Sequence, residues 1–448
     1  MPISYDFSKL FPDTFPYMLD YIERFDMKEP VRKQRLRLLM WALALPETYA
    51  HKLKIHYHGD VKKLKPPYFL LANHNAFLDM KNLIRATLPK PCNYVIAIDG
   101  FIGREGLLRT IGGICTRKFV FDVNLILQMQ ESIRKKHICV LYPEARYSLC
   151  GTEAVIPSSV AKLAKLLNVP LVTLVCHGDH INSPFWNTRN RKIKGIEADM
   201  QILATPDELK AMPVEELQQK IDDALWYDDY AWQKEKGVKV TVPWRAEGLH
   251  KVLYQCPHCG TEYRMSSKGS TLTCEACGKS WEMSELGELK AKEGNTEFAH
   301  IPNWYEWERA NVRKEIEEGK YRFESVVHVE ALPNADRYIP IGKATLIHDM
   351  EGFHLSGNYQ GEDYKYEWQA KNLYSCHIEY EYLGTKGDCV DLNLPNDTFY
   401  IYPECELFSV TKLSLATEEL HKYVLKKEQE AEKTQQVVPE SAPEAINA

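Results

Sequence analysis

A histidine and an aspartate with the spacing of a proton-transfer pair lie in the first quarter of the chain. His74 and Asp79 belong to the segment NHNAFLD, which follows the apolar run YFLLA at 68–72. An aspartate that accepts a hydrogen bond from one imidazole nitrogen leaves the other nitrogen free to take a proton from a hydroxyl group. The pair predicts a general base, although a histidine near the beginning of a helix is more often structural.

A second polar segment follows a later apolar run. The run ICVLY at 138–142 leads directly into PEARYS at 143–148, which contains Glu144 and Arg146. We expect both apolar runs to be strands of one domain, so each polar segment follows a strand end. This second segment strengthens the prediction of a catalytic site.

Together the two segments resemble the glycerolipid acyltransferase family, which is typified by bacterial 1-acylglycerol-3-phosphate acyltransferases. The family's Asn-His-x-Ser-x-x-Asp block is matched by Asn73, His74 and Asp79, and its Phe-Pro-Glu-Gly-x-Arg-Ser block by Pro143, Glu144 and Ser148. GGICTR at 112–117 is similar to the family's glycine-to-arginine block, and VP at 169–170 to its hydrophobic-proline block. Four blocks in order are more specific than any one of them.

The chain departs from the family pattern at four positions. Ala76 replaces the usual serine, Ala145 replaces a glycine, and Arg146 comes one position earlier than the family arginine. Arg117 is one residue closer to its glycine than usual, which leaves Lys118 at the expected offset. The proton-transfer pair is intact, whereas the groups that would bind the acceptor are shifted.

The resemblance implies direct acyl transfer from acyl-CoA or acyl-carrier protein, without an acyl-enzyme. His74 is implied to be the general base, and Asp79 to orient it and to stabilise the imidazolium. The substrate-binding residues that we expect are Asn73, Arg117, Glu144 and Arg146. The two arginines would hold an anionic head group because guanidinium matches phosphate with paired hydrogen bonds. Glu144 would brace them or contact glycerol hydroxyls.

Four cysteines in two CxxC pairs predict a structural zinc site. The residues are Cys256, Cys259, Cys274 and Cys277, with 14 residues between the pairs. Four thiolates complete a closed tetrahedral shell, which leaves no open position for catalysis. We therefore expect a zinc ribbon over 250–285 that links two larger domains. Zinc ribbons also bind nucleic acids, but the basic excess here is weak.

Alternating strand and helix patterns predict an α/β acyltransferase domain over 66–245, with a mixed sheet flanked by helices. The expected strands cover 68–72, 94–98, 138–142, 171–176 and 195–204. The expected helices cover 122–136, with Asp122 as a cap, 158–167, and one long helix that begins after Thr205 and Pro206 and runs toward Lys236.

The flanking segments complete the predicted organisation. Residues 1–65 are expected to be helical, and the basic then apolar stretch 28–46 is a candidate membrane-docking segment or an ordinary first helix. A helical linker is expected over 300–325. Tyrosine, valine and turn residues over 326–427 predict a small β-rich, barrel-like domain with a last helix that begins at Ser414. This domain resembles a pleckstrin-homology-type arrangement. Residues 428–448 are expected to be disordered.

Composition limits the partners and the location. The chain has 448 residues and a net charge of -6, so we expect no nucleic-acid partner. No apolar stretch approaches the ~18 residues of a membrane span, and the first residues lack the pattern of a signal peptide. We expect a cytoplasmic protein, peripheral on the cytosolic membrane face.

The sequence thus predicts an O-acyltransferase of phospholipid biosynthesis. The expected acceptor is a lysophospholipid, above all 1-acyl-sn-glycerol 3-phosphate, and the expected partners are that lipid, an acyl thioester and a membrane surface. One alternative keeps the chemistry with another acceptor, such as a lyso-aminolipid. The other is a non-catalytic scaffold that binds lipid or nucleic acid.

Overall fold

A computed structural model describes residues 19, 22–29, 31–32, 34–384 and 386–436 of the chain. Its first domain contains a seven-stranded sheet with the strand order β1-β7-β6-β2-β5-β3-β4. Neighbouring strands are parallel except β6 and β7, so the sheet is mixed, as predicted. The strands are β1 Lys54–Tyr57, β2 Tyr68–Ala72, β3 Cys92–Ala97, β4 Gly113–Thr116, β5 Ile138–Leu141, β6 Leu171–His177 and β7 Glu197–Ala204.

Helices cover both faces of this sheet. Alternate residues of β2 separate two cores, because Phe69 and Leu71 pack on one face while Leu70 packs on the other. The helices of this domain are α1 Arg37–Ala50, α2 Leu78–Thr87, α3 Ile98–Phe101, α4 Glu105–Thr110, α5 Val123–Arg134, α6 Ser159–Leu167, α7 Asp179–Asn182, α8 Pro206–Ala211, α9 Val214–Leu225 and α10 Asp229–Lys236. Residues of α1 and α2 belong to one core, and residues of α5, α6, α8 and α9 to the other.

The helix caps predicted at Asp122 and Thr205 are present, but the length predicted for one helix is wrong. The Asp122 side chain caps α5, and Thr205 opens α8 with a capping box. The single long helix expected from here toward Lys236 is three helices, α8, α9 and α10. Pro213 separates the first two, and Asp228 starts the third as a new cap. Proline has no N–H to donate, so it begins a new helix instead of continuing the previous one.

Two strands of the sheet were not predicted. β1 is short and only half-buried, and β4 is four residues long and begins with glycine. Neither has the continuous apolar run by which the central strands are recognised. Both are edge strands, and β4 ends directly before Arg117 and Lys118.

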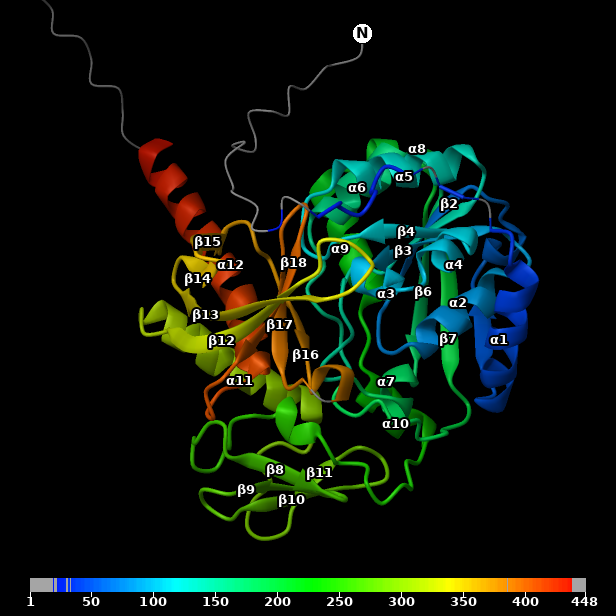
Figure 1. Ribbon diagram of the computed structural model, residues 1–448. Coiled ribbons are helices and arrows are strands. Elements are labelled where there is room, and N and C mark those ends of the chain that lie inside the picture. The colour runs from blue at the N-terminus through cyan, green and yellow to red at the C-terminus, as the bar shows by residue number, and fades with distance from the viewer. Residues whose placement is uncertain (1–18, 20–21, 30, 33, 385, 437–448) are drawn as a thin grey trace, which may run out of the picture.

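A small sheet has the strand order β11-β10-β9-β8, and of the four cysteines only Cys274 belongs to it, while the other three lie in loops. Its strands are β8 Met265–Lys268, β9 Thr271–Cys274, β10 Ser280–Met283 and β11 Leu289–Ala291. The helix α11 Ile301–Glu317 packs on it, because the rings of Trp281 and Trp304 lie 4.9 Å apart, edge to face. Figure 1 shows this sheet below both larger domains.

The C-terminal domain is an antiparallel sheet with the order β15-β14-β13-β12-β18-β17-β16. Its strands are β12 Phe323–Ala331, β13 Ile339–Asp349, β14 Gly352–Tyr359, β15 Glu362–Gln369, β16 His377–Glu379, β17 Cys389–Asn393 and β18 Thr398–Pro403. The predicted β-rich domain is therefore present, while the pleckstrin-homology resemblance stays a prediction. Figure 1 shows this domain beside the α/β domain.

The last helix, α12, covers Val410–Gln436. It begins four residues earlier than the predicted start at Ser414 and includes 428–436, which composition had indicated as disordered. Buried Leu413, Leu415 and Leu420 anchor its first half, so the helix extends past the point where polar residues begin to dominate. Residues 437–448 lie outside the described chain.

The N-terminal segment is described only in part, since residues 1–18, 20–21, 30 and 33 lie outside the described chain. The basic stretch up to 36 is not helical where it is described, and α1 begins at Arg37. Leu38, Leu39 and Leu43 of α1 are exposed. Within the described ranges, no helix combines the length and apolarity needed to cross a bilayer.

Candidate active site

The loop between β2 and α2 brings His74 and Asp79 together. Asp79 lies in the first turn of α2, and its Oδ2 is 3.1 Å from Nδ1 of His74. The same oxygen accepts hydrogen bonds from the backbone N–H groups of Asn75 and Ala76. These contacts fix the carboxylate and place the imidazole proton on Nδ1, so Nε2 is the nitrogen that can accept a proton.

Aromatic side chains hold the imidazole ring. Tyr142 stacks on it at 4.2 Å between ring centroids, and Tyr147 packs at 4.3 Å. Burial, assisted by the charge of Lys118, lowers the pKa of His74 to about 3. The ring is therefore neutral at physiological pH, which is the state that a general base requires.

A second aspartate, Asp179 of α7, stands behind the pair, and sequence reasoning missed it. Burial raises the pKa of Asp79 to about 7, and it raises the pKa of Asp179 well above its ordinary value. The side-chain interaction between the two carboxyl groups lowers the pKa of Asp79 and raises that of Asp179, so a proton shared by the pair resides preferentially on Asp179. Asn82 donates to Asp179 at 2.6 Å. No local spacing pointed to Asp179, because it follows a different strand.

Asn73 and Glu144 both bind backbone. The Asn73 amide exchanges two hydrogen bonds with the backbone of Cys176, at 2.9 and 2.8 Å, and so joins the end of β2 to β6. The Glu144 carboxyl accepts from the N–H groups of His74 and Ala154, at 2.9 and 2.8 Å. Burial raises the pKa of Glu144 to about 8. In this arrangement both side chains position the His74 loop, and their substrate-binding role stays a prediction.

The two arginines that were predicted to hold an anionic head group are both bound by the C-terminal domain. Arg117 donates to the carbonyl groups of Leu332, Pro333 and Asn396 and to the Thr398 hydroxyl, at 2.6 to 3.0 Å. Arg146 is paired with Glu418 of α12 at 2.6 Å. Both arginines also line the cavity beside His74, so their role in holding a head group stays a prediction. Their contacts with the C-terminal domain were not predicted because the residues that supply them are more than 200 positions away in sequence.

A cavity of about 1430 Å³ opens beside His74. This exceeds the ~300–1,000 Å³ of ordinary small-molecule pockets. Apolar side chains from β3, α4, α5 and α6 line much of it, among them Val95, Ile96, Leu108, Leu125, Ile126 and Leu163. The C-terminal domain also contributes to the wall, with Tyr374, His377, Glu379 and Tyr382. The cavity can hold a long alkyl chain together with a polar group.

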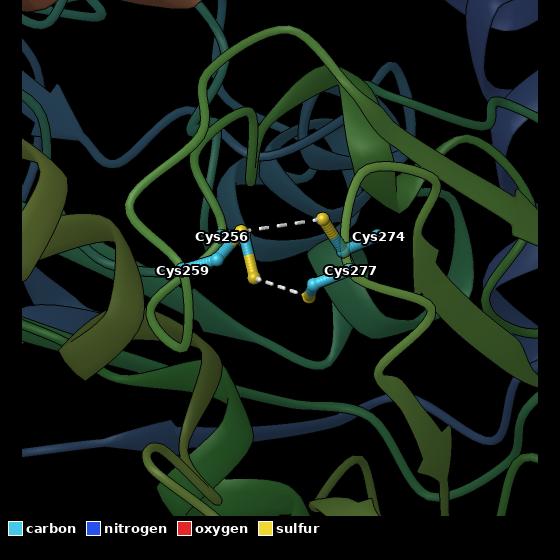
Figure 2. A group of neighbouring side chains, drawn as sticks. All are labelled: Cys256, Cys259, Cys274 and Cys277. Atoms are coloured by element: carbon cyan, nitrogen blue, oxygen red, sulfur yellow. Dashed lines mark hydrogen bonds between the residues drawn. The ribbon is translucent and has the colours of Figure 1, made fainter.

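The four predicted zinc ligands converge in the small sheet. Figure 2 shows the sulfur atoms of the four cysteines turned toward one another. The Sγ atoms of Cys256 and Cys277 are 3.8 Å apart, as are those of Cys259 and Cys274, and all four lie within 4.8 Å. Zinc–sulfur bonds of ~2.3 Å in a tetrahedron place the sulfurs ~3.8 Å apart, so the cluster fits one zinc ion.

Comparisons with known proteins found a likeness to part of the chain. No family model and no curated protein matches the chain. Among solved structures, the 1-acyl-sn-glycerophosphate (LPA) acyltransferase of Thermotoga maritima is similar to part of it, at 15% identity and a TM-score of 0.35. The match covers 45% of this chain and 80% of that chain. A likeness of this extent leaves the function to be argued from the residues of the site.

Proposed function

We propose that this protein transfers an acyl group from a thioester, acyl-CoA or acyl-carrier protein, to a hydroxyl group of a lysophospholipid. The observation that carries the proposal is the pairing of His74 with Asp79, at 3.1 Å, on the wall of a large cavity lined mainly by apolar side chains. A general base beside space for an alkyl chain suits acylation of a lipid alcohol.

The reaction follows from the protonation states of the site. Nε2 of neutral His74 takes the proton of the acceptor hydroxyl, and the oxygen attacks the thioester carbonyl. The tetrahedral intermediate expels the thiolate, which takes the proton back from the imidazolium. Ionised Asp79 stabilises that imidazolium through Nδ1, so its negative charge is needed while the proton resides on the ring.

The zinc ribbon and the exposed face of α1 have supporting roles in this proposal. The cysteine cluster would hold structural zinc, because four thiolates leave no coordination position for a substrate. Exposed Leu38, Leu39 and Leu43 follow the basic segment and could enter a membrane surface that supplies the acceptor.

Release of free CoA from a long-chain acyl-CoA tests the proposal. We expect turnover with 1-acyl-sn-glycerol 3-phosphate or another lysophospholipid in a panel, and a loss of at least ~100-fold for His74→Ala, the range expected for a general base. His56→Ala, a matched change at an exposed histidine away from the cavity, should keep full activity. Acyl-carrier-protein donors follow if acyl-CoA gives no turnover.

Lysolipid binding without turnover by any thioester would contradict the proposal and would favour a non-catalytic lipid-binding scaffold.

A further inference from the structure

The polar end of the cavity is built by both large domains. His377 and Glu379 lie on β16 of the C-terminal domain, two positions apart, so both side chains are on the same face of the strand. His377 Nδ1 is 3.2 Å from Asp391 of the neighbouring strand β17. From the α/β domain come Asp99 of α3 and Lys118, which follows β4. All but Asp391 line the cavity that contains His74.

Carboxylates outnumber cations in this group. Lys118 lies between Asp391 and Asp99, at 3.5 and 3.6 Å. Burial disfavours its charge, but the two carboxylates outweigh this effect and raise the pKa of Lys118. One ammonium group thus faces two carboxylates within 4 Å, and Glu379 adds a third at longer range, so one cation is shared by three carboxylates.

In the part of the chain that the structure describes, the partners of Glu379 are weak, since the charges of His377 and Lys118 act on it without a hydrogen bond. Its closest basic neighbour is His377, at 3.8 Å, and no hydrogen bond to its carboxyl is found among the described residues. Burial raises the pKa of Glu379, since the carboxylate gains too little from its surroundings. His377 is also buried, with a side-chain exposure of 5%. A mostly buried carboxylate with weak partners, on the wall of a cavity, would be stabilised by a cationic group of a bound ligand.

An anionic head group finds few free donors here. Terminal nitrogens of Arg117 and Arg146 bind the C-terminal domain, the buried Nε of each has no hydrogen-bond partner among the described residues, and Lys118 is already paired. Arg104 and Lys162, the remaining lysine or arginine side chains that line the cavity, are exposed. A phosphate would have to bind at those exposed positions.

We propose that Glu379 and Asp99 form the subsite for an ammonium group on the head group of the acceptor lipid, so that the C-terminal domain selects the acceptor. This inference rests on the proposed acyl transfer and specifies its substrate class. The ammonium group of the ligand neutralises the excess carboxylate, and its alkyl chain occupies the apolar part of the cavity beside His74.

Two acceptors that differ only in this group test the inference. The head groups of 1-acyl-sn-glycero-3-phosphoethanolamine and 1-acyl-sn-glycero-3-phosphoglycerol share the phosphodiester, but only the first has an ammonium group. We expect kcat/KM to be at least ~10-fold higher for the ethanolamine acceptor, as one charge-assisted hydrogen bond allows. Glu379→Gln should remove most of that preference and change the glycerol acceptor by less than ~2-fold.

A matched control is Glu367→Gln, a glutamate on β15 that is 43% exposed and does not line the cavity. It should leave the preference unchanged. A preference for 1-acyl-sn-glycerol 3-phosphate, or an equal effect of Glu379→Gln on both acceptors, would overturn the inference. Loss of the preference in Arg104→Gln but not in Glu379→Gln would also overturn the inference, because the Glu379 carboxylate would then not determine the preference.

Measurements of lipid binding test the ammonium subsite separately from acyl transfer. Calorimetric titration of His74→Ala with the same two lysolipids, below their micelle concentrations, does not require turnover. Tighter binding of the ethanolamine lipid that depends on Glu379 would support the subsite even if no acyl transfer is found. Acyl transfer that ignores the head-group charge would support the reaction and reject the subsite.

Discussion

At the residue scale, His74 depends on groups that hold it and not only on the aspartate that it contacts. Its backbone N–H is fixed by Glu144, its ring by two tyrosines, and its Nδ1 by Asp79. The side chain of Asp179 in turn interacts with the carboxyl group of Asp79 and lowers its pKa. The chain of contacts makes the charge of Asp79, rather than that of His74, the quantity that changes near neutral pH.

The pH dependence of activity follows from this arrangement. Since the pKa of Asp79 is about 7 and that of His74 is about 3, kcat/KM should rise as the pH passes through ~7, where Asp79 ionises. Asp179→Ala removes the side chain that stabilises ionised Asp79, so the rise of kcat/KM (the acidic limb of the pH profile) should move to higher pH. Asp179→Asn keeps a donor and should leave the limb nearly in place. A full pH profile of both variants checks this, and an identical shift in the two would assign Asp179 a packing role only.

One departure from the family pattern has a structural consequence. Ala145, which stands where the family has glycine, has a φ of 54°, in the left-handed region that favours glycine. The turn after Pro143 therefore keeps the backbone conformation that a glycine would adopt without strain. The adjacent Arg146 points toward Glu418, so the turn now serves a domain contact.

At the element scale, the zinc ribbon joins the other domains through α11. Glu308 of this helix accepts a hydrogen bond from the N–H of Gln255 at 2.7 Å, next to Cys256, the first cysteine of the cluster. Trp304 donates to the carbonyl of the same residue at 3.0 Å. The first cysteine loop is therefore held directly by a helix that also packs on α12.

Removal of zinc should loosen this junction. We expect one zinc ion per chain by elemental analysis, and chelation should lower the melting temperature because a structural site contributes directly to folding. Cys256→Ser should have the same effect, whereas Cys405→Ser, a cysteine outside the cluster, should not. The ribbon assignment would be wrong if the isolated protein held no zinc and both variants melted alike.

The exposed face of α1 predicts a contact with lipid. Replacing Leu38, Leu39 and Leu43 by glutamine should weaken binding to anionic vesicles, since each leucine would bury apolar area in the interface. Folding should be unaffected because these side chains are 75%, 48% and 67% exposed. Co-sedimentation with vesicles measures the effect. Unchanged binding would mean that another surface contacts the lipid.

At the scale of the whole molecule, buried ion pairs connect the α/β domain to the C-terminal helix. Glu418 of α12 binds Arg146 and Arg309, both at 2.6 Å, and accepts a third hydrogen bond from Ser375 at 2.9 Å. Burial alone would raise the pKa of Glu418, but the two arginines lower it to about 2. A single carboxylate of α12 thus binds the segment 143–148 that follows β5, the helix α11 and the C-terminal domain.

Acid should break this connection. The pKa of Glu418 in the folded protein, about 2, lies below the ordinary value of ~4.3. Ionised Glu418 therefore stabilises the folded protein fully above pH ~4.5, and this stabilisation is lost as the pH falls toward 2. Glu418→Gln should lower the free energy of unfolding at pH 7 by ~3–5 kcal/mol, because it leaves buried arginines unpaired. Denaturant titrations from pH 2 to 7 measure both effects.

Below pH ~4.5, the free energy of unfolding of Glu418→Gln should also depend less on pH than that of the wild type, by the contribution of about one proton. Glu404→Gln, at a 40% exposed ion pair with Lys343, should cost less than ~1 kcal/mol and keep the wild-type pH dependence. Equal stability losses in the two variants would contradict the role of Glu418.

Features that depend on a few neighbouring residues were determined by the sequence itself. The cysteine spacing predicted a four-cysteine cluster that fits a metal ion, the NHNAFLD segment predicted that His74 and Asp79 lie together, and apolar runs predicted the central strands. Backbone geometry over a short segment fixes which of these groups meet. The caps at Asp122 and Thr205 belong to the same class.

Only the tertiary structure decided the partners of the charged groups. Arg117 and Arg146 could be assigned to a phosphate from their local pattern, yet their contacts come from residues more than 200 positions away. The same holds for Asp179 behind Asp79 and for Glu379 beside Asp99. A guanidinium or a carboxylate is satisfied by whichever opposite charge the packing brings near, and one sequence does not show which domain will supply it.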